Sequence, residues 1–479
     1  MKRTAIKLSV FTLSVLLFAG CTGYRGLNTE SEIDKIPLVG VQTEKGDWPD
    51  EKWWEKLNDP QLNELVEDAL AGNPSLSEAQ ARIRQAQAAA GIADSANSVQ
   101  VNGDAASTYQ RFPRHETYPS QHAGRKDTVN RLQITAGYDF DLWGKNKADY
   151  EAALGGVRIA EVDGEAAKLT LVSALVLDYV RLDSAYRNED LKKEMLDRYA
   201  QIIDLQKKRY DAGLDSQQNI NVTESAMHSV SADIKKLQEE QTLLKISLGT
   251  MTGIGTERGL KLNRPALGEY ASACLPEDLP AELIGRRPDI AAQKWRIEAM
   301  QQRIKSAKTE FYPNVNLNAF AGFRSIGLEN LLRTGSGTFG IGPAVSLPIF
   351  NGGALRSGLA MKNAQYDEAV ERYNTLILNA VQEVADLAVS GRENMKQLED
   401  RQNAVGSLIN AKKLSDLNYK SGIASALPAL NTEIDILNAK SAVIALKSRQ
   451  TEIAVSMTRA LGGGAETGIK NGEEKKNNE

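Results

Sequence analysis

The chain carries two copies of one long unit, and this internal repeat limits its possible folds more than any other feature. The phrase Tyr-x-x-Gly-x-x-Ser occurs at Tyr210–Ser216 and again, 209 residues later, at Tyr419–Ser425. Further matches follow the same order in both halves and pair residues 73–83 with 287–297, 98–102 with 312–316, 140–143 with 347–350 and 251–253 with 460–462. A period of about 210 residues is far longer than that of a solenoid repeat. We therefore expect two related, domain-sized halves.

Most of each unit is predicted to be helical. A helix is expected to begin at Pro74 and at Pro288, because proline at the first helical position loses no hydrogen bond. Residues 144–210 and 352–420 contain no proline. Each of these stretches predicts a helix of roughly 100 Å, at about 1.5 Å per residue.

The first long helix has a heptad pattern that favours coiled-coil packing against a neighbour. The residues at multiples of seven are Leu175, Leu182, Leu196, Ile203 and Tyr210, with Glu189 as the exception. Gly155, Gly156 and Gly164 are expected to bend or fray the beginning of this helix, because glycine is a poor helix former.

Two pairs of segments alternate apolar and polar residues, which predicts β-strands with one apolar and one polar face. The apolar positions are Val99, Val101, Gly103, Ala105, Leu132, Ile134, Ala136, Tyr138, Phe140 and Leu142 in the first half, and Val315, Leu317, Ala319, Phe339, Ile341, Val345, Leu347 and Ile349 in the second. Polar linkers over about residues 111–130 and 324–337 join the strands of each pair.

These strands have two interpretations, a half-buried sheet on a soluble core or part of a membrane β-barrel. We favour the barrel because aromatic residues gather at one set of strand ends, as in an aromatic girdle; they are Trp143, Phe311, Tyr312 and Phe350. Four strands cannot close, since a closed barrel needs about eight or more and open edges are not tolerated in lipid. Several copies of the chain would therefore have to share one barrel.

The N-terminus has the features of a secretory targeting segment. Basic residues are followed by an apolar stretch, Leu8–Ala19, and a small-residue cleavage site. Cys21 follows directly, which resembles the bacterial lipobox and implies lipidation; Phe18 departs from the usual aliphatic residue. The alternative is an ordinary signal peptide with an incidental cysteine. Thr22 is not aspartate, and this resemblance implies sorting to the outer membrane. The second cysteine, Cys274, is interpreted as structural or incidental.

Composition and motifs exclude several function classes. A net charge of −4 leaves no basic excess for a nucleic-acid partner. No apolar run of about 20 residues follows the N-terminal segment, which excludes an α-helical membrane bundle. The sequence has no phosphate-binding Gly-x-x-x-x-Gly-Lys loop, no paired methionine motif and only three histidines, His115, His122 and His228. We therefore predict no enzyme, no cofactor and no metal site, and a partner must supply the energy for any transport.

At Leu279–Ile290 the sequence LPAELIGRRPDI is similar to the LP-x-x-L-x-x-RRPDI signature of outer-membrane efflux lipoproteins. These are the TolC-like outer-membrane factors, in the branch typified by OprM. The residues Trp53, Trp54, Asp59, Pro60 and Leu62 resemble the N-terminal segment of that branch, and the two Tyr-x-x-Gly phrases resemble its periplasmic tips. The similarity covers about residues 18–463.

The resemblance implies an α+β membrane protein with an internal two-fold repeat. Four transmembrane β-strands per chain would contribute to a trimeric, twelve-stranded β-barrel, continued by a long periplasmic α-helical coiled-coil barrel. It also implies a lipid-anchored, membrane-spanning location in the outer membrane of a Gram-negative bacterium. The implied partners are two further copies of the chain, a periplasmic adaptor protein, an inner-membrane pump and outer-membrane lipid.

The expected organisation has six parts. They are a lipoprotein signal peptide (1–20), a lipidated N-terminal and equatorial segment (21–72), repeat 1 (73–253, with a β-hairpin at about 97–142 and a tip at 210–216), an equatorial linker (254–286), repeat 2 (287–463, with a β-hairpin at about 312–350 and a tip at 419–425) and a disordered tail (464–479).

The two repeated phrases are expected to be helical hairpin tips. A glycine just past a helix takes the left-handed cap, here Gly213 and Gly422, and a following serine caps the next helix. The second helices are predicted over residues 216–250 and 425–461. This hairpin chemistry explains the glycine and serine without any partner.

The family resemblance adds two functional interpretations of the tips. The adaptor-docking residues would be Gly213, Leu214, Ser216, Gly422, Ile423 and Ser425. The gate residues would be Tyr419, Leu427, Asn431, Tyr210 and Asn219. Asn219 and Asn431 occupy places where relatives often carry an acidic residue, so we expect closure by Leu427 and Tyr419 packing with asparagine hydrogen bonds. Asp211 and Asp215 are interpreted as solvated turn residues, and gating through carboxylates is disfavoured.

Three functions compete on this basis. The favoured one is a passive outer-membrane exit duct of a tripartite efflux pump, supported by the lipobox and the RRPDI motif. The others are an outer-membrane duct of a type I protein secretion system and a coiled-coil lipoprotein without a pore. Drugs, dyes, aromatic acids and metals are all open as cargo.

Overall fold

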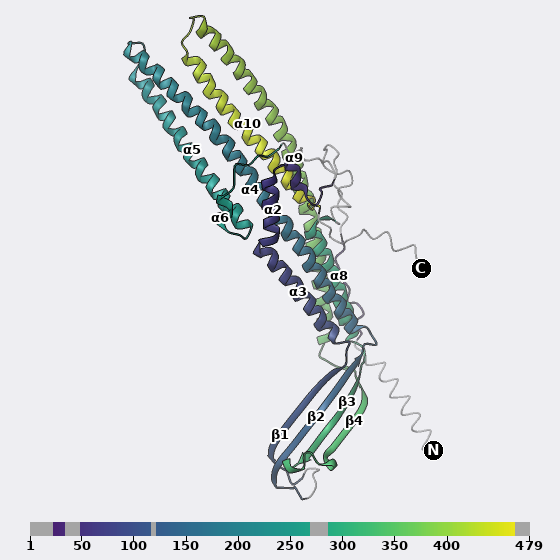
Figure 1. Ribbon diagram of the computed structural model, residues 1–479. Coiled ribbons are helices and arrows are strands. Elements are labelled where there is room, and N and C mark those ends of the chain that lie inside the picture. The colour runs from purple at the N-terminus through teal and green to yellow at the C-terminus, as the bar shows by residue number, and fades with distance from the viewer. Residues whose placement is uncertain (1–22, 34–47, 116–120, 269–285, 465–479) are drawn as a thin grey trace. The chain divides into compact units, whose positions relative to one another are not determined.

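The computed structural model in Figure 1 describes residues 23–33, 48–115, 121–268 and 286–464. The chain divides into two compact units, each assembled from separate segments. The first unit comprises residues 1–33, 82–160 and 293–373, and the second comprises residues 34–81, 161–292 and 374–479. Within the described ranges, no helix is both long and apolar enough to cross a membrane.

The first unit contains one antiparallel sheet in the order β1-β2-β3-β4 (Figure 1). Its strands are β1 (Gln100–Arg111), β2 (Lys126–Phe140), β3 (Asn314–Ile326) and β4 (Gly337–Ser346). Short 3-10 turns η2 (Leu328–Asn330) and η3 (Thr334–Ser336) connect β3 to β4. β1 and β4 are the two edges, so each has one side that is unpaired in the sheet.

The alternating pattern predicted these strands, but their ends differ from the prediction. β2 begins inside the predicted linker, because Lys126 pairs with Arg111. Leu142 lies beyond β2, since the carboxylate of Asp141 accepts hydrogen bonds from the N–H groups of Asn146 and Lys147 at the start of the next helix. Val99, Leu347 and Ile349 also lie outside the strands, and Pro348, which follows Leu347, has no N–H for a ladder.

The strand register gives the sheet one apolar and one polar face. The apolar face carries Val101, Ala105, Leu132, Ile134, Ala136, Tyr138, Phe140, Val315, Leu317, Ala319, Ala321, Phe323, Phe339, Ile341 and Val345. The opposite face carries mostly polar and small residues, among them Asn102, Asp104, Gln133, Thr135, Asn314, Asn316 and Asn318. Many apolar-face side chains are exposed in the single chain, including Phe339 at 86% and Ile341 at 75%.

Both helices that were predicted to begin at a proline do so, namely α3 (Pro74–Ser95) and α8 (Pro288–Thr309). The predicted fraying at Gly155 and Gly156 is wrong, because α4 (Lys145–Asp211) runs through both residues without a break. A Cβ atom on Gly155 would lie 2.9 Å from the Cβ atom of Ala299 on α8. This glycine therefore allows two helices to approach closely.

Two helical hairpins follow from the two repeats, and most of their residues belong to the second unit (Figure 1). α4 is paired with α5 (Gln217–Met251), and α9 (Ala354–Lys420) is paired with α10 (Leu427–Ala460). A short helix, α6 (Thr256–Leu260), follows α5. α4 and α9 are each 67 residues long.

The N-terminal Trp-Trp-x-x-x-x-Asp-Pro segment forms the core of the second unit. The 3-10 helix η1 (Trp53–Leu57) and α2 (Pro60–Gly72) bury their apolar residues against Val172, Leu175, Tyr179 and Leu182 of α4, with Leu248, Leu262 and Val455 nearby. The Asp59 carboxylate accepts hydrogen bonds from Gln61 N at 3.0 Å, Tyr179 Oη at 2.8 Å and Ala266 N at 2.8 Å. Burial raises the pKa of the Tyr179 hydroxyl, so it stays neutral and donates to Asp59.

The heptad exception on α4 is a buried carboxylate. Glu189 is 5% exposed and accepts hydrogen bonds from Gln238 at 2.8 Å and Gln241 at 2.7 Å on α5, and Lys193 lies 2.8 Å away. Of the predicted heptad residues, Leu175, Leu182 and Ile203 are buried, whereas Tyr210 is exposed. The apolar packing therefore weakens toward the end of α4.

In each repeat, the residue before the first proline bonds to the end of the last hairpin helix, and we call this contact the joint of the repeat. The two repeats form it with different side chains. In the first, Asn73 Nδ2 donates to Met251 O at 2.7 Å, at the end of α5. In the second, Arg287 Nη1 donates to Ala460 O at 3.1 Å, at the end of α10. Arg287 also binds Asp289 at 2.9 Å and Glu383 at 2.8 Å, and Arg459 binds Glu383 at 3.0 Å. The second arginine of the RRPDI motif, Arg287, thus forms the joint of the second repeat with a charged guanidinium group. Asn73 forms the joint of the first repeat with a neutral side-chain amide.

The C-terminal glycines complete the second joint. α10 ends at Ala460, and Gly462, Gly463 and Gly464 all have positive φ, as expected of a helix terminator. A Cβ atom on Gly462 would lie 2.3 Å from Arg286 O, and the same atom on Gly253 would lie 2.1 Å from Gly72 O in the first repeat. Both glycines are therefore required by a close backbone contact as well as by φ.

Candidate functional site

The first predicted tip, at residues 210–216, is a closely bonded helical turn. Gly213 has φ of 73°, and Leu214 N donates to Arg209 O at 2.8 Å, which ends α4 in a left-handed cap. Ser216 caps α5 through a hydrogen bond from Asn219 N to its hydroxyl at 3.3 Å. The predicted roles of Gly213 and Ser216 in hairpin geometry are both confirmed.

The carboxylate of Asp215 organises this tip. It accepts hydrogen bonds from Asn219 Nδ2 at 2.7 Å and from Ser216 N at 2.9 Å, and it forms an ion pair with Arg209 Nε at 3.2 Å. These bonds, that from Asn219 foremost, hold the pKa of Asp215 below its usual value. The interpretation of Asp215 as a solvated turn residue was therefore wrong, because its side chain is bonded within the tip.

The second predicted tip, at residues 419–425, has the same helix end but a different helix start. Gly422 has φ of 72°, and Ile423 N donates to Asn418 O at 2.9 Å. Ser425 was expected to cap the next helix, and this is wrong: the N-cap is Ala426, with no side-chain hydrogen bond. Pro428 lies in the first turn of α10, where its missing N–H removes one of the donors that a serine would satisfy.

The predicted gate residues differ in burial and in their hydrogen bonds. Leu427 is half-buried against an apolar cluster formed by α4, α5 and α10, which contains Met195, Ile202, Val230, Ile434 and Leu437. Tyr210 and Tyr419 are exposed, as is Asn431. Asn219 bonds to Asp215 within its own tip. The apolar docking residues Leu214 and Ile423 are 67% and 77% exposed.

An ion-pair cluster between the two hairpins was not predicted. Glu433 on α10 pairs with Arg198 on α4 and, at 2.9 Å, with Lys412 on α9. Lys412 also pairs with Asp416 at 2.9 Å, and these two carboxylates raise its pKa. Arg198 and Glu433 belong to different repeats, so no local spacing in the sequence could have shown their contact.

Of the four aromatic residues predicted to form a girdle, three are exposed and one is buried. Trp143 stacks on Tyr312 with ring centroids 4.8 Å apart, and both side chains are exposed at the strand ends. Trp143 Nε1 also donates to Pro313 O at 2.8 Å. Phe350 is 88% exposed, but Phe311 is buried and packs edge-on against Tyr24. Phe311 is therefore a core residue of the first unit.

Residues 23–33 belong to the first unit and contact its other segments. Tyr24 contacts Phe311 at a ring-centroid distance of 5.6 Å, and its hydroxyl lies 3.4 Å from that of Tyr312. The N–H groups of Glu30 and Ser31 donate to Asp367 Oδ1 at 2.9 and 3.0 Å. Cys21 and Cys274 lie outside the described residues, as do the signal peptide and most of the predicted tail.

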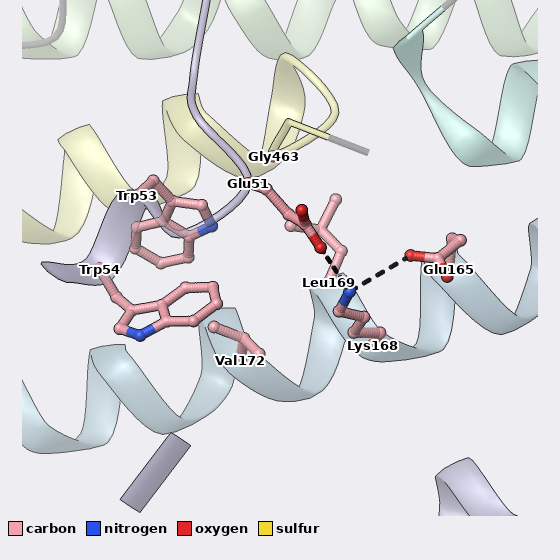
Figure 2. A pocket seen from close by; sticks show the side chains of 8 residues that line it. All are labelled: Glu51, Trp53, Trp54, Glu165, Lys168, Leu169, Val172 and Gly463. Atoms are coloured by element: carbon pink, nitrogen blue, oxygen red, sulfur yellow. Dashed lines mark hydrogen bonds and ion pairs between the residues drawn. The ribbon is translucent and has the colours of Figure 1, made fainter. Parts of the chain in front are cut away.

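A cavity of about 180 Å³ lies in the second unit beside the two tryptophans (Figure 2). Figure 2 shows Lys168 between Glu51 and Glu165, with Nζ–Oε distances of 3.1 and 3.7 Å. Leu169, Val172 and Gly463 complete the wall. Throughout the described ranges, no three His, Cys, Asp or Glu side chains are placed to hold a metal ion.

An antiparallel sheet with one apolar and one polar face has the residue pattern of a channel-forming membrane β-barrel protein. The sequence profile described as "Outer membrane efflux protein" matches residues 65–254 and 279–463, well over half of the chain. The chain belongs to this family of transport ducts, and it functions as an outer-membrane efflux channel.

Individual relatives agree. The chain is 34% identical over 368 residues to the fusaric acid resistance protein FusA of Burkholderia cepacia, covering 75% of this chain and 69% of that protein. It is 28% identical over 471 residues to the multidrug resistance outer membrane protein MdtP of Escherichia coli K12, covering 95% and 96%.

Solved structures agree with the fold. The outer membrane protein VceC of Vibrio cholerae matches with a TM-score of 0.80 at 32% identity, covering 87% of this chain and 100% of that one. The CmeC outer membrane channel of Campylobacter jejuni matches with a TM-score of 0.81 at 23% identity, covering 93% and 96%. The second likeness concerns the fold alone.

Proposed function

We propose that the chain forms, as a homotrimer, the passive exit duct of a tripartite efflux pump in the outer membrane. The observation that carries this proposal is the four-stranded sheet, which has an exposed apolar face, a polar face and two unpaired edges. Membership of the outer membrane efflux protein family supports the direction of transport, from the periplasm to the exterior.

The two faces and edges of the sheet support a barrel shared between copies. An apolar face that includes Phe339 and Ile341 is suited to lipid, whereas the asparagine-rich face is suited to a water-filled lumen. Edge strands cannot stay unpaired in a bilayer. We therefore propose that β1 of one copy pairs with β4 of the next, and that three copies make a twelve-stranded barrel.

We also propose that Cys21 is lipidated and anchors the chain to the outer membrane. The contact of Tyr24 with Phe311 and Tyr312 supports this, because it places the residues that follow Cys21 beside the exposed Trp143–Tyr312 stack. Aromatic side chains of this kind favour the membrane interface. The helical hairpins would then lie in the periplasm.

The hairpin tips are proposed to dock a periplasmic adaptor protein, which links the duct to an inner-membrane pump. Each tip exposes an apolar side chain, Leu214 or Ile423, next to a positive-φ glycine. The docking set also includes Ser216 and Ser425. The gate is proposed at Leu427, Tyr419, Tyr210, Asn431 and Asn219, near the same tips.

The names of the relatives suggest the cargo. FusA is named for fusaric acid resistance and MdtP for multidrug resistance. We propose small organic molecules as cargo for this chain. A duct for type I protein secretion is the alternative, and the relatives named for drug and small-acid resistance favour the first.

The proposal is tested by single-channel recording of the purified protein in planar bilayers. We expect small, rarely open currents that grow when Leu427→Ala loosens the tips. Leu243→Ala, on the exposed surface of α5, is the matched control and should leave the currents unchanged. Large steady currents in wild type and mutant alike would contradict the gate. Trimeric, membrane-inserted protein without currents would contradict the duct.

A further inference from the structure

Two arginines lie directly opposite each other on the polar face of the sheet. Arg131 on β2 is the register partner of Arg324 on β3, and both side chains are exposed. Like charges directly opposite on neighbouring strands destabilise a sheet. Among the described residues, neither arginine forms an ion pair or a side-chain hydrogen bond. The pair therefore needs a compensating reason for its position.

A second cross-strand pair of like charges provides an internal comparison. Arg111 on β1 is opposite Lys126 on β2, at the last pair of that ladder and on the apolar side of the sheet. Charges at the end of a ladder can turn away from each other into water. Arg131 and Arg324 lie inside the ladder, followed by the pairs of Asn130 with Ser325 and Val129 with Ile326. They have less freedom to separate.

Next to the arginine pair, β3 contributes no side chain to the polar face. Gly322 is the next residue of β3 on this face, and a Cβ atom there would lie 2.5 Å from Gln133 Cα. Beyond it, Phe320 lies over Gly340 of β4, where a Cβ atom would be 2.7 Å from the ring. Phe320 is the one aromatic side chain that the described strands place on this face. Gly322 therefore leaves the stretch of β3 between Arg324 and Phe320 without a side chain on this face.

The nearest carboxylate does not neutralise the pair. Asp104 on β1 is opposite Gln133, one pair along this face from Arg131, so the three charged groups together carry one net positive charge. Asp127 and Asp139 lie on the same face of β2, toward its opposite ends. Asp127 accepts a hydrogen bond from Thr128 N at 2.8 Å and lies 3.9 Å from His122.

We propose that Arg131 and Arg324 form an anion-selective zone on the wall of the duct, which favours carboxylate-bearing small molecules during passage. This inference rests on the proposed function, because only a shared, closed barrel makes the polar face a lumen. A trimer would bring three copies of the pair to one level, in a confined space where charges of one sign concentrate counter-ions. Guanidinium groups bind carboxylates bidentately, and Phe320 offers an apolar surface to the rest of the molecule.

The test is the reversal potential of single channels in a gradient of KCl and then of potassium benzoate. The double variant Arg131→Gln/Arg324→Gln should lower the anion-to-cation permeability ratio about threefold or more, since it removes the concentrating charge. Arg131→Lys/Arg324→Lys keeps the charge and should preserve most of the ratio for chloride, with a larger loss for benzoate, because lysine cannot bind bidentately. Arg111→Gln/Lys126→Gln removes the same charges from the other face and is the matched control.

The outcomes separate this inference from the proposed function. Conducting channels whose permeability ratio is equal in wild type and in the Arg131/Arg324 glutamine variant would overturn the anion-selective zone and leave the duct intact. An equal loss in the Arg111/Lys126 variant would also overturn it, because the effect would not belong to one face. Inserted protein that never conducts would overturn the duct, and the inference with it.

Discussion

Gly213 and Gly422 each hold φ near +70° at the end of a long helix. A residue with a Cβ atom pays about 1 kcal/mol for that conformation. Gly213→Ala should therefore lower the stability of the first tip by about that amount and speed hydrogen exchange of the amides around residue 213. Gly406→Ala, in the middle of α9 with open space around it, should be neutral or slightly stabilising. Equal exchange in wild type and Gly213→Ala would contradict the cap.

Glu189 gives a pH-dependent prediction. Burial acts to raise its pKa, but hydrogen bonds from Lys193, Gln241 and Gln238 outweigh burial and lower the pKa from 4.5 to about 2. Because the folded-state pKa is depressed, the stabilisation is fully present above about pH 4.5 and is lost as the pH falls toward 2. Wild type should thus melt at a higher temperature than Glu189→Gln from pH 7 to 5, and the difference should shrink below pH 4.5.

The control for this experiment is Glu399→Gln, which changes an exposed carboxylate on α9. Its melting temperature should follow that of wild type at every pH. A difference between wild type and Glu189→Gln that stays constant down to pH 2.5 would show that the ionised carboxylate is not what stabilises this position.

At the residue scale, the features that depend only on neighbouring residues were predictable from the sequence. Gly213, Gly422 and Ser216 were predicted because a left-handed cap and a serine cap depend on a few neighbouring residues. The bonds of Asp215 were not predicted, because its partners Arg209 and Asn219 are set by the exact path of the turn. The prediction that Ser425 caps the next helix was wrong, because Pro428 in the first turn of α10 removes one of the N–H donors that a serine would satisfy.

At the scale of elements, the joint of the second repeat depends on one guanidinium group. Arg287 is mostly buried and binds Asp289, Glu383 and the carbonyl of Ala460. Arg287→Met would leave two carboxylates without their main partner. We expect the free energy of unfolding to fall by about 2 kcal/mol. This loss is smaller than for a fully buried pair because both acids are partly exposed. Thermal unfolding measures this, with the exposed Arg392→Met as control. Equal melting of both variants would contradict the role of the joint.

Glu433 is predicted to hold the two hairpins together. It binds Arg198 of the first hairpin and Lys412 of the second. If opening the tips separates the hairpins, Glu433→Gln should increase the open probability of single channels severalfold, since several-fold changes correspond to about 1 kcal/mol. Glu224→Gln removes the Lys207–Glu224 pair, which lies within one hairpin, and is the control. An unchanged open probability in Glu433→Gln would show that this cluster does not restrain opening.

The elements themselves were largely predictable, because hydrophobic period and proline position are visible in the sequence. Pro74, Pro288 and the alternating strands were located on that basis. The strand ends were not predictable. The carboxylate of Asp141 accepts hydrogen bonds from the first turn of α4, and the strand ladder therefore ends before Leu142. The role of Gly155 was also missed, because its partner Ala299 lies in the other repeat.

At the scale of the whole molecule, the repeat and the two faces of the sheet predicted that one chain cannot close a barrel by itself. The sequence pattern gives four strands, and the edges β1 and β4 are the unpaired ends of that sheet. The number of copies could not be derived from the sequence pattern, because it depends on curvature that is set only when the strands of several chains meet. The proposed trimer therefore rests on the resemblance to the family.

The most direct test of that assembly is native mass spectrometry of the full-length protein, extracted from membranes in mild detergent and taken from the fraction that conducts in planar bilayers. We expect a single species of three chains. A conducting fraction made of single chains or of pairs would contradict it.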